Sequence, residues 1–406
     1  MSMKIVCILL LLFGIADEVQ SSRFSALQMF GNVINDLPDD NVIICPPAID
    51  LALVQLYLAG GGTTETDLEN SLGYKGPSIF KGNLPSWVSE GNPLIRIASR
   101  FYARKGVKIS STYHSEYAKY LNTVIENVDE NENWAETINP WVTSQTAEDL
   151  EDLIEPHQFE DPKKVFLTNT VNFFAQWKYQ FKPIADENFY IPDESRSESV
   201  KMMKLEGNLK YSFLNKLDCH VVIIPFDKTN LDMLLLFPKT YHGIQKIEEG
   251  LKHVDVHKTS VKHLHLSMPQ FKFKYSRDMV QTLIDLGVNK TVFTHPNLAK
   301  LTTSNENFII DSIMHSAIIN FDDKGVKSDF ATGVDVIATE SRRNPRRRSG
   351  LHRGRQKRAA PNLSLVFNRP FLFAIMDTKR MYLFGRYSHP SDIYKTEYVR
   401  SYNRKP

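Results

Sequence analysis

The residues with the clearest chemical potential form one basic run near the C-terminus. Residues Ser341 to Arg358 read SRRNPRRRSGLHRGRQKR, with eight arginines, one lysine and no acid. The run ends with Arg355, Lys357 and Arg358 ahead of Ala359, a pattern that dibasic-cleaving proteases read through acidic subsites. The predicted chemistry is therefore cleavage of this chain by a partner enzyme. The candidate scissile bonds are those after Arg342, Arg343 and Arg348, and the bond Arg358-Ala359.

Two other interpretations of the run stay open. It could be a solvated insertion that only raises solubility, or a segment that binds a polyanion such as a heparin-like glycan. Nucleic acid is disfavoured, because no aromatic residues are interleaved with the arginines. The whole chain holds 49 Lys and Arg against 47 Asp and Glu, so the body without this run is net acidic.

Composition and the N-terminus predict a secreted globular protein. Of the 406 residues 42% are hydrophobic and 24% charged, which allows a large core and excludes disordered and collagen-like classes. Residues 1–16 join a basic end at Lys4 to an apolar run with small residues Gly14 and Ala16, the pattern of a signal peptide. No later stretch is apolar enough to span a bilayer. We expect an extracellular monomer that does not engage a membrane.

The cysteines and sequons fit that compartment. Cys45 and Cys219 remain after the leader, and two distant cysteines favour two buried free thiols over one bridge. Asn289 and Asn362 each begin a glycosylation sequon, which predicts a glycoprotein.

The sequence contains none of the common catalytic motifs considered. The sequence lacks G-x-S-x-G, H-E-x-x-H, a P-loop and a dinucleotide fingerprint, so we predict no catalytic residue and no cofactor. A loose group of histidines could bind a metal, but ordinary surface and strand positions are favoured, and no metal site is predicted. The histidines of this group are His253, His257, His263 and His265.

The elements that would position these residues are mixed helices and strands. PPAIDLALVQLYLAGGG predicts a buried helix that ends at glycine, and Thr64 to Asp67 predicts a capping-box start for the next. Further helices are expected over 137–153 and 277–286. Strands are predicted in LIRIASRFY, KVFLTNTVNFF, CHVVIIPF paired through DKTN with LDMLLLF, KHLHLSMPQFKFKY, NLSLVF, PFLFAIM and RMYLFGR. This is a mixed α/β pattern without regular βαβ alternation.

Six stretches in order give the chain a resemblance to the serpins. They are NVIICPPAIDLAL with GGGTT, FLTNTVNFFAQWKYQF, VKMMKLEG, MPQFKFKY, HSAIINFDDKG and FNRPFLFAIMDTKRMYLFGR. The resemblance implies an α+β fold over residues 17–390 with three β-sheets, eight or nine helices and an exposed reactive-centre loop at about 325–366. The basic insertion, 341–358, falls inside that loop, and the tail 391–406 is expected to be disordered.

The resemblance also implies a mechanism. A serine endopeptidase acylates the loop, and the freed loop inserts into the central sheet as a new strand, which distorts the enzyme before it can deacylate. The hinge is the segment that enters first, and Phe330 asks a packed sheet to accept a ring, which costs ~1–3 kcal/mol. The implied hinge residues are Gly325, Val326, Lys327, Ser328, Asp329, Phe330, Ala331 and Thr332.

Loop length is a second test of that mechanism. Gly325 and Phe371 are 46 positions apart, about twenty more than the resemblance implies. A cut after Arg358 would leave ~60 Å of extended chain between the inserted strand and the acyl bond, at ~3.3 Å per residue. The protease would then be tethered and not distorted, whereas cuts after Arg342 or Arg343 remain mechanically possible.

The resemblance implies a polar gate under the central sheet as a third test. Asn169 and His315 match the family's polar pair, whereas the two family serines correspond to Cys45 and Ala48. Loss of the hydroxyls either strands a buried donor or makes the site more apolar. Two hypotheses therefore remain: an inhibitor of trypsin-like or convertase-type serine proteases, or a serpin that does not trap, whose loop is a processed or polyanion-binding segment.

Overall fold

The structure is a computed structural model. It describes residues 26–37, 39–73, 95–104, 106–115, 124–129, 134–145, 164–192, 195–303, 308–326, 363–378, 380–390 and 396–397. The expected signal peptide, the basic insertion, the hinge beyond Val326 and Asn362 lie outside the described residues. Predictions for Lys327 to Thr332 and for the scissile and convertase-recognition positions 342, 343, 348, 355, 357, 358 and 359 therefore stay predictions.

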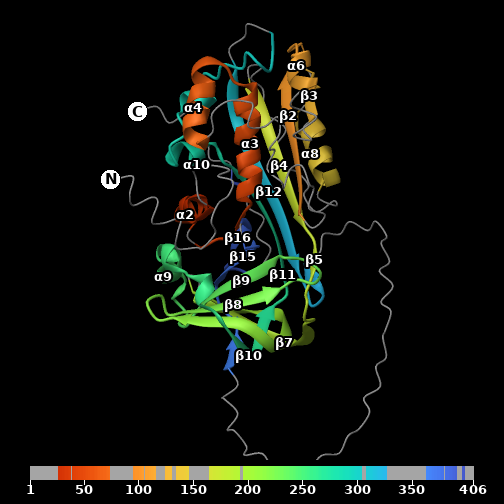
Figure 1. The fold of residues 1–406 in the computed structure, drawn as a ribbon. Coiled ribbons are helices and arrows are strands. Elements are labelled where there is room, and N and C mark those ends of the chain that lie inside the picture. Colours follow the sequence, from red (N-terminus) through yellow and green to blue (C-terminus); the bar gives the residue numbers. More distant parts are fainter. Residues whose placement is uncertain are drawn as a thin grey trace, which may run out of the picture.

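The central sheet has eight strands and stands upright in Figure 1. Its path runs β17-β11-β12-β4-β2-β3, with β13 and β5 attached beyond the end of β12. Its middle strands β4 and β12 run parallel, and β11 and β2 flank them antiparallel. The strands are β2 (Ile95–Arg104), β3 (Val124–Val128), β4 (Lys164–Phe173), β5 (Ala175–Gln176), β11 (Phe271–Asp278), β12 (Ile309–Phe321), β13 (Gly325–Val326) and β17 (Thr396–Glu397).

The other nine strands form one hydrogen-bonded network below it. Its order is β1-β16-β15-β9-β8-β7-β10-β14, with β6 also paired to β7. Because β7 has 19 residues, its first part pairs with β6 and β10 and its last part with β8, so two of the three expected sheets are joined along one strand. The strands are β1 (Val42–Ile44), β6 (Lys182–Ile191), β7 (Arg196–Leu214), β8 (Cys219–Pro225), β9 (Asp232–Pro238), β10 (Ser260–Pro269), β14 (Leu363–Val366), β15 (Phe371–Met376) and β16 (Met381–Tyr387).

Eight α-helices lie within the described residues, which with the two sheet networks confirms the mixed α/β fold class. All fourteen residues of α3 are buried, because it packs against α4 and against strands of both sheet networks, β4, β12 and β16. The helices are α2 (Ala26–Asp36), α3 (Pro46–Ala59), α4 (Gly62–Leu72), α6 (Ser111–Tyr113), α8 (Trp134–Gln145), α9 (Ile244–Glu249), α10 (Val280–Asp285) and α11 (Thr291–Thr294), with 3-10 turns η3 (Leu251–His253) and η4 (Val256–Lys258).

Three predicted boundaries are wrong. The capping-box start at Thr64 fails because α4 already begins at Gly62, and the Thr64 hydroxyl accepts from the Asn297 backbone instead. Helix α8 begins at Trp134, not at position 137. The helix expected from Arg277 starts at Val280, because β11 continues through Asp278, whose carboxylate accepts from the Val280 N–H at 3.1 Å.

The C-terminal tail also departs from expectation at one point. Thr396–Glu397 form β17, which pairs in parallel with Ser276 and Arg277 of β11. The expected disorder therefore does not hold for these two residues, since pairing satisfies backbone groups at the edge of β11. The rest of the tail beyond Pro390 lies outside the described residues.

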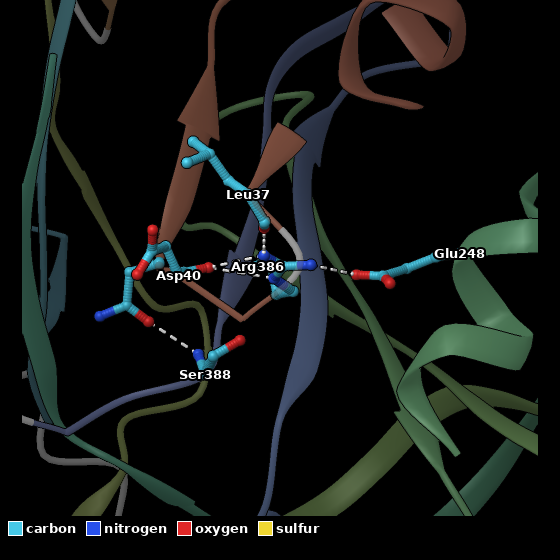
Figure 2. Close-up of polar contacts among 6 residues, drawn as sticks. Leu37, Asp40, Glu248, Arg386 and Ser388 are labelled. Carbon is cyan, nitrogen blue, oxygen red and sulfur yellow. Dashed lines mark hydrogen bonds and ion pairs between the residues drawn. The ribbon is translucent and has the colours of Figure 1, made fainter. Parts of the chain in front are cut away.

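A buried arginine near the C-terminus binds backbone groups near the N-terminus (Figure 2). Arg386 on β16 is fully buried, donates to the carbonyls of Leu37 and Asp40, and pairs with Glu248 on α9 at 2.8 Å. Beside it the Ser388 N–H donates to the Asn41 side chain. Burial raises the pKa of Glu248, and Arg386 opposes that rise. Removing one partner would leave the other as a buried unpaired charge.

Cys45 and Cys219 are buried and form no disulfide, which confirms the prediction that both are free thiols. Burial raises the pKa of Cys45 and of Cys219 to about 12, so neither is a ready thiolate. Among the described helices, none has the length and apolar character that crossing a membrane requires.

Candidate functional site: the loop anchors and the gate beneath the central sheet

The N-terminal end of the loop is already seated in the central sheet. Strand β13 pairs antiparallel with β12 through Val326 and Phe321, and with β5 through Gly325–Gln176 and Val326–Ala175. Val326 is buried, as an inward-facing hinge residue would be. The chain thus starts a strand at the end of the sheet, between β12 and β5.

A compact turn fixes the direction of this entry. The Asp322 carboxylate accepts from the Lys324 and Gly325 N–H groups at 2.8 and 3.0 Å. The indole of Trp177 donates to the Asp322 carbonyl at 2.8 Å, and the Trp177 N–H donates to the Lys324 carbonyl. The Trp177 ring stacks between Phe226 and Phe321. Asp322 and Trp177 were not predicted from the sequence, although the Asp-Asp-Lys-Gly order is a recognisable turn signal.

Gly325 is required by the space at this turn. A Cβ there would lie 2.8 Å from the Cα of Gln176 and closer still to the carbonyl oxygen of Ala175. Both are backbone atoms of β5, which cannot rotate away. The hinge glycine therefore lets β13 pass close against β5.

Beyond the hinge, the central sheet is closed. Strands β4 and β12 pair directly from Lys164–Ile309 to Val171–Ala317, with an irregularity between Ile310 and Ser312. A strand that continued inward from β13 would have to separate this pair. The facing backbone groups of β4 and β12 can therefore either pair with each other, as here, or pair with a strand inserted between them.

The C-terminal end of the loop is held differently. Among the described strands, β14 pairs only with β10, in parallel, so it lies at the edge of the described sheet. Phe367 follows it, fully buried and stacked on Phe237. The Arg369 guanidinium donates to the Pro238 and Lys239 carbonyls and lies 4.1 Å from the Phe237 ring centroid. The loop is thus firmly tied at both described ends.

The gate residues lie where β4 and β12 meet α3. Asn169 and His315 are direct partners in the parallel ladder, and both are fully buried. The Cys45 N–H, just ahead of α3, donates to His315 Nε2 at 3.2 Å. Burial lowers the pKa of His315 to about 4, against a smaller opposing effect of the Ile43 backbone. His315 is therefore a neutral acceptor at physiological pH.

Two residues that the sequence analysis missed complete this network. Gln55 Nε2 donates to the Ser99 hydroxyl at 2.8 Å, and that hydroxyl donates to Asn169 Oδ1 at 2.6 Å. Within the described chain, the buried Asn169 Nδ2 has no hydrogen-bond partner. The gate therefore contains a buried donor, and its link to the absent hydroxyls at Cys45 and Ala48 stays a prediction. No local pattern marks Ser99 or Gln55, since each belongs to a different element.

The structure divides the histidine group. His263 and His265 project from β10 toward Glu206 on β7, whereas His253 ends η3 elsewhere and nothing is described of the His257 side chain. The sequon residue Asn289 is exposed, and its Nδ2 donates to Asp67 Oδ2 at 3.0 Å.

This arrangement is typical of a protein whose loop connects a short hinge strand in the central sheet, β13, to a strand of the second sheet network, β14. The family model of the serpins, serine protease inhibitors, matches residues 20–390, and the chain belongs to that family. The family is one of protease inhibitors, which confirms that the protein is not an enzyme.

Sequence relatives and solved structures are consistent with membership of the serpin family. Serine protease inhibitor 42Dd of Drosophila melanogaster is 23% identical over 401 residues, covering 96% of this chain and 100% of the relative. Rat neuroserpin is 26% identical over 385 residues, covering 88% and 89%. Native protease nexin-1, crystallised with heparin, shares the fold with a TM-score of 0.73 at 21% identity, covering 90% and 96%.

Proposed function

We propose that this protein is a secreted serpin that engages trypsin-like or dibasic-specific serine endopeptidases through its arginine-rich loop. The observation that carries the proposal is β13, which is seated between β5 and β12 at the end of the closed β4–β12 pair. The leader pattern of residues 1–16 supports secretion, and the arginines support a basic-specific enzyme.

Trapping fits the first arginines of the run best. The protease serine attacks the carbonyl carbon of Arg342 or Arg343, an ester forms as the amide bond to the next residue breaks, and the released amine takes a proton. The new end of the loop then continues β13 between β4 and β12. These bonds lie close enough to the hinge for the attached enzyme to be drawn against the sheet, unlike the bond after Arg358.

A second function is favoured by the 46 positions between Gly325 and Phe371. With that length, a convertase cut at Arg358-Ala359 leaves the enzyme free, and the loop acts as a processed segment. Alternatively, the basic run would serve to bind a polyanion. The heparin in the protease nexin-1 structure makes heparin the natural probe, and retention of wild type but not of a run-deleted variant on a heparin column would support it.

A denaturing gel separates the two functions. The mature protein is incubated with trypsin or with a furin-type convertase, and then boiled in detergent. A band at the summed mass supports trapping, whereas clipped serpin beside fully active protease rejects it. R342A/R343A should abolish the trypsin adduct, and the matched R358A should leave it unchanged while blocking convertase cleavage.

The length hypothesis has its own variant. Deletion of Arg346 to Ala360 combined with F330A should remove 15 of the roughly twenty extra loop residues and the bulky hinge side chain. We expect a larger ratio of trapped to cleaved serpin. No gain from the combined variant, with its fold intact by circular dichroism, would contradict the hypothesis.

A further inference from the structure

The outward face of the β7–β10 ribbon gathers three metal-binding side chains. His263 and His265 alternate with buried Leu264 and Leu266 along β10, so both imidazoles project to the same face. Glu206 of β7 is the direct ladder partner of His265 and faces the same side. Two adjacent strands therefore present two nitrogen donors and one carboxylate at a single point.

The distances match a coordination site. His263 Nε2 lies 3.3 Å from Glu206 Oε1, and His265 Nδ1 lies 3.5 Å from Glu206 Oε2. One ligand atom from each of the three residues lies within 4.8 Å of the others. Ligand atoms bound ~2.05 Å from a tetrahedral Zn²⁺ are ~3.3 Å apart, so small side-chain adjustments bring all three onto one ion.

We propose that Glu206, His263 and His265 form a binding site for a divalent transition metal, with Zn²⁺ as the preferred ion. Two imidazoles and a carboxylate suit zinc and leave the fourth position to water. Calcium and magnesium are disfavoured, because both prefer oxygen ligands. This site is independent of the proposed inhibitory function and goes beyond the sequence-based expectation of no metal.

The site lies one strand away from the loop's C-terminal anchor. His265 is flanked on one side by Glu206 of β7 and on the other by Ser364 of β14, its parallel ladder partner. A bound ion would cross-link β7 to β10, the only neighbour of β14 among the described strands. Metal binding should therefore stabilise the sheet edge from which the loop departs.

Direct titration tests the site. The full mature protein is stripped with a chelator, dialysed, and titrated with ZnCl₂ by calorimetry. We expect one equivalent to bind, and H263A/H265A to weaken that binding at least a hundredfold. E206Q should weaken it about tenfold or more, because the amide lacks the charge of the carboxylate. The exposed His253 provides the matched control, and H253A should bind as wild type does.

Cobalt supplies a structural readout. Co²⁺ in a four-coordinate site gives visible absorption far stronger than the hydrated ion, and this signal should disappear on addition of zinc and be absent from H263A/H265A. Binding weaker than 1 mM in wild type, or equal binding by wild type and H263A/H265A, would overturn the proposal. Should the double variant fail to fold, E206Q carries the same test, since Glu206 is exposed.

Discussion

The same residue type serves two opposite purposes in this molecule. His315 is completely buried between β12 and α3, and burial lowers its pKa to about 4, so it acts as a neutral acceptor for the Cys45 N–H. His263 and His265 are 45% and 22% exposed on the outer face of β10 and face a carboxylate. Solvent access thus decides whether an imidazole is a structural acceptor or an available ligand.

The largest expected effect comes from removing the buried member. H315A leaves a cavity and strands the Cys45 N–H, which together should lower the free energy of unfolding by ~2–5 kcal/mol. Chemical denaturation measures the loss. H263A is the control at the exposed position, where a change within ~0.5 kcal/mol is expected. Similar losses in both variants would break the comparison.

His315 and the nearby Asp278 should change the stability of the protein in opposite directions as pH falls. The unfolded imidazole takes up a proton near 6.5 but the folded one only near 4, so His315 lowers stability as pH falls from 6.5 to 4. Asp278 is buried beside β12, where it accepts from the Val280 and Ile313 N–H groups. Burial raises its pKa from 3.8 to about 6, so the folded protein takes up that proton first and gains stability as pH falls from 6 to 4.

Each of these two contributions amounts to about 3 kcal/mol, at ~1.4 kcal/mol per pKa unit, so they nearly cancel between pH 4 and 6. H315Q, which keeps an acceptor but does not titrate, should leave a gain in stability over that interval. D278N should leave a loss. Denaturation midpoints at pH 4, 5, 6 and 7 measure both, and unchanged pH profiles in the two variants would contradict the assignment.

A smaller effect is expected from repairing the gate. A48S restores a hydroxyl that the family resemblance implies at this gate position; if that hydroxyl pairs with the buried Asn169 Nδ2, it should stabilise the protein by about 1 kcal/mol. The matched control is A52S, one turn further along α3, where a hydroxyl enters a fully buried position and should destabilise by ~1–3 kcal/mol. Equal losses in A48S and A52S would show that the gate does not lack a hydroxyl.

The smallest effect belongs to the exposed histidines without metal. H263A/H265A should change the stability of chelator-treated protein by less than ~0.5 kcal/mol, because both side chains face solvent. With zinc at a hundred times its dissociation constant, wild type alone should gain ~2.7 kcal/mol. Thermal unfolding with and without zinc measures the difference, and a gain in both proteins would place the ion elsewhere.

Local sequence was sufficient for much of the fold. The β8–β9 hairpin was predicted because two apolar strands flank the turn residues DKTN, and the structure confirms it. The exact start of α10 was not predictable in the same way. Asp278 ends a strand and accepts from Val280, so its role depends on β12, which lies 35 positions away at Ile313.

The candidate site divides along the same line. Asn169 and His315 came from the family resemblance, and their ladder pairing places them together. Ser99 and Gln55 carried no local signal, since a single serine or glutamine is a common residue whose partners lie on other strands and helices. Glu206 was missed for the same reason, because only the β7–β10 register brings it to His265.

By itself, the sequence determined the family, the burial of the two thiols, about half of the described strands, and an arginine-rich segment between Gly325 and Phe371. The family follows from the resemblance of six stretches, and the strands follow from residue types and short-range periodicity, which need no knowledge of distant partners. Only the tertiary structure decided which histidine is buried, which donor is stranded and which carboxylate meets two imidazoles. Burial and pairing are properties of strands that are far apart in the chain, so no local window contains them.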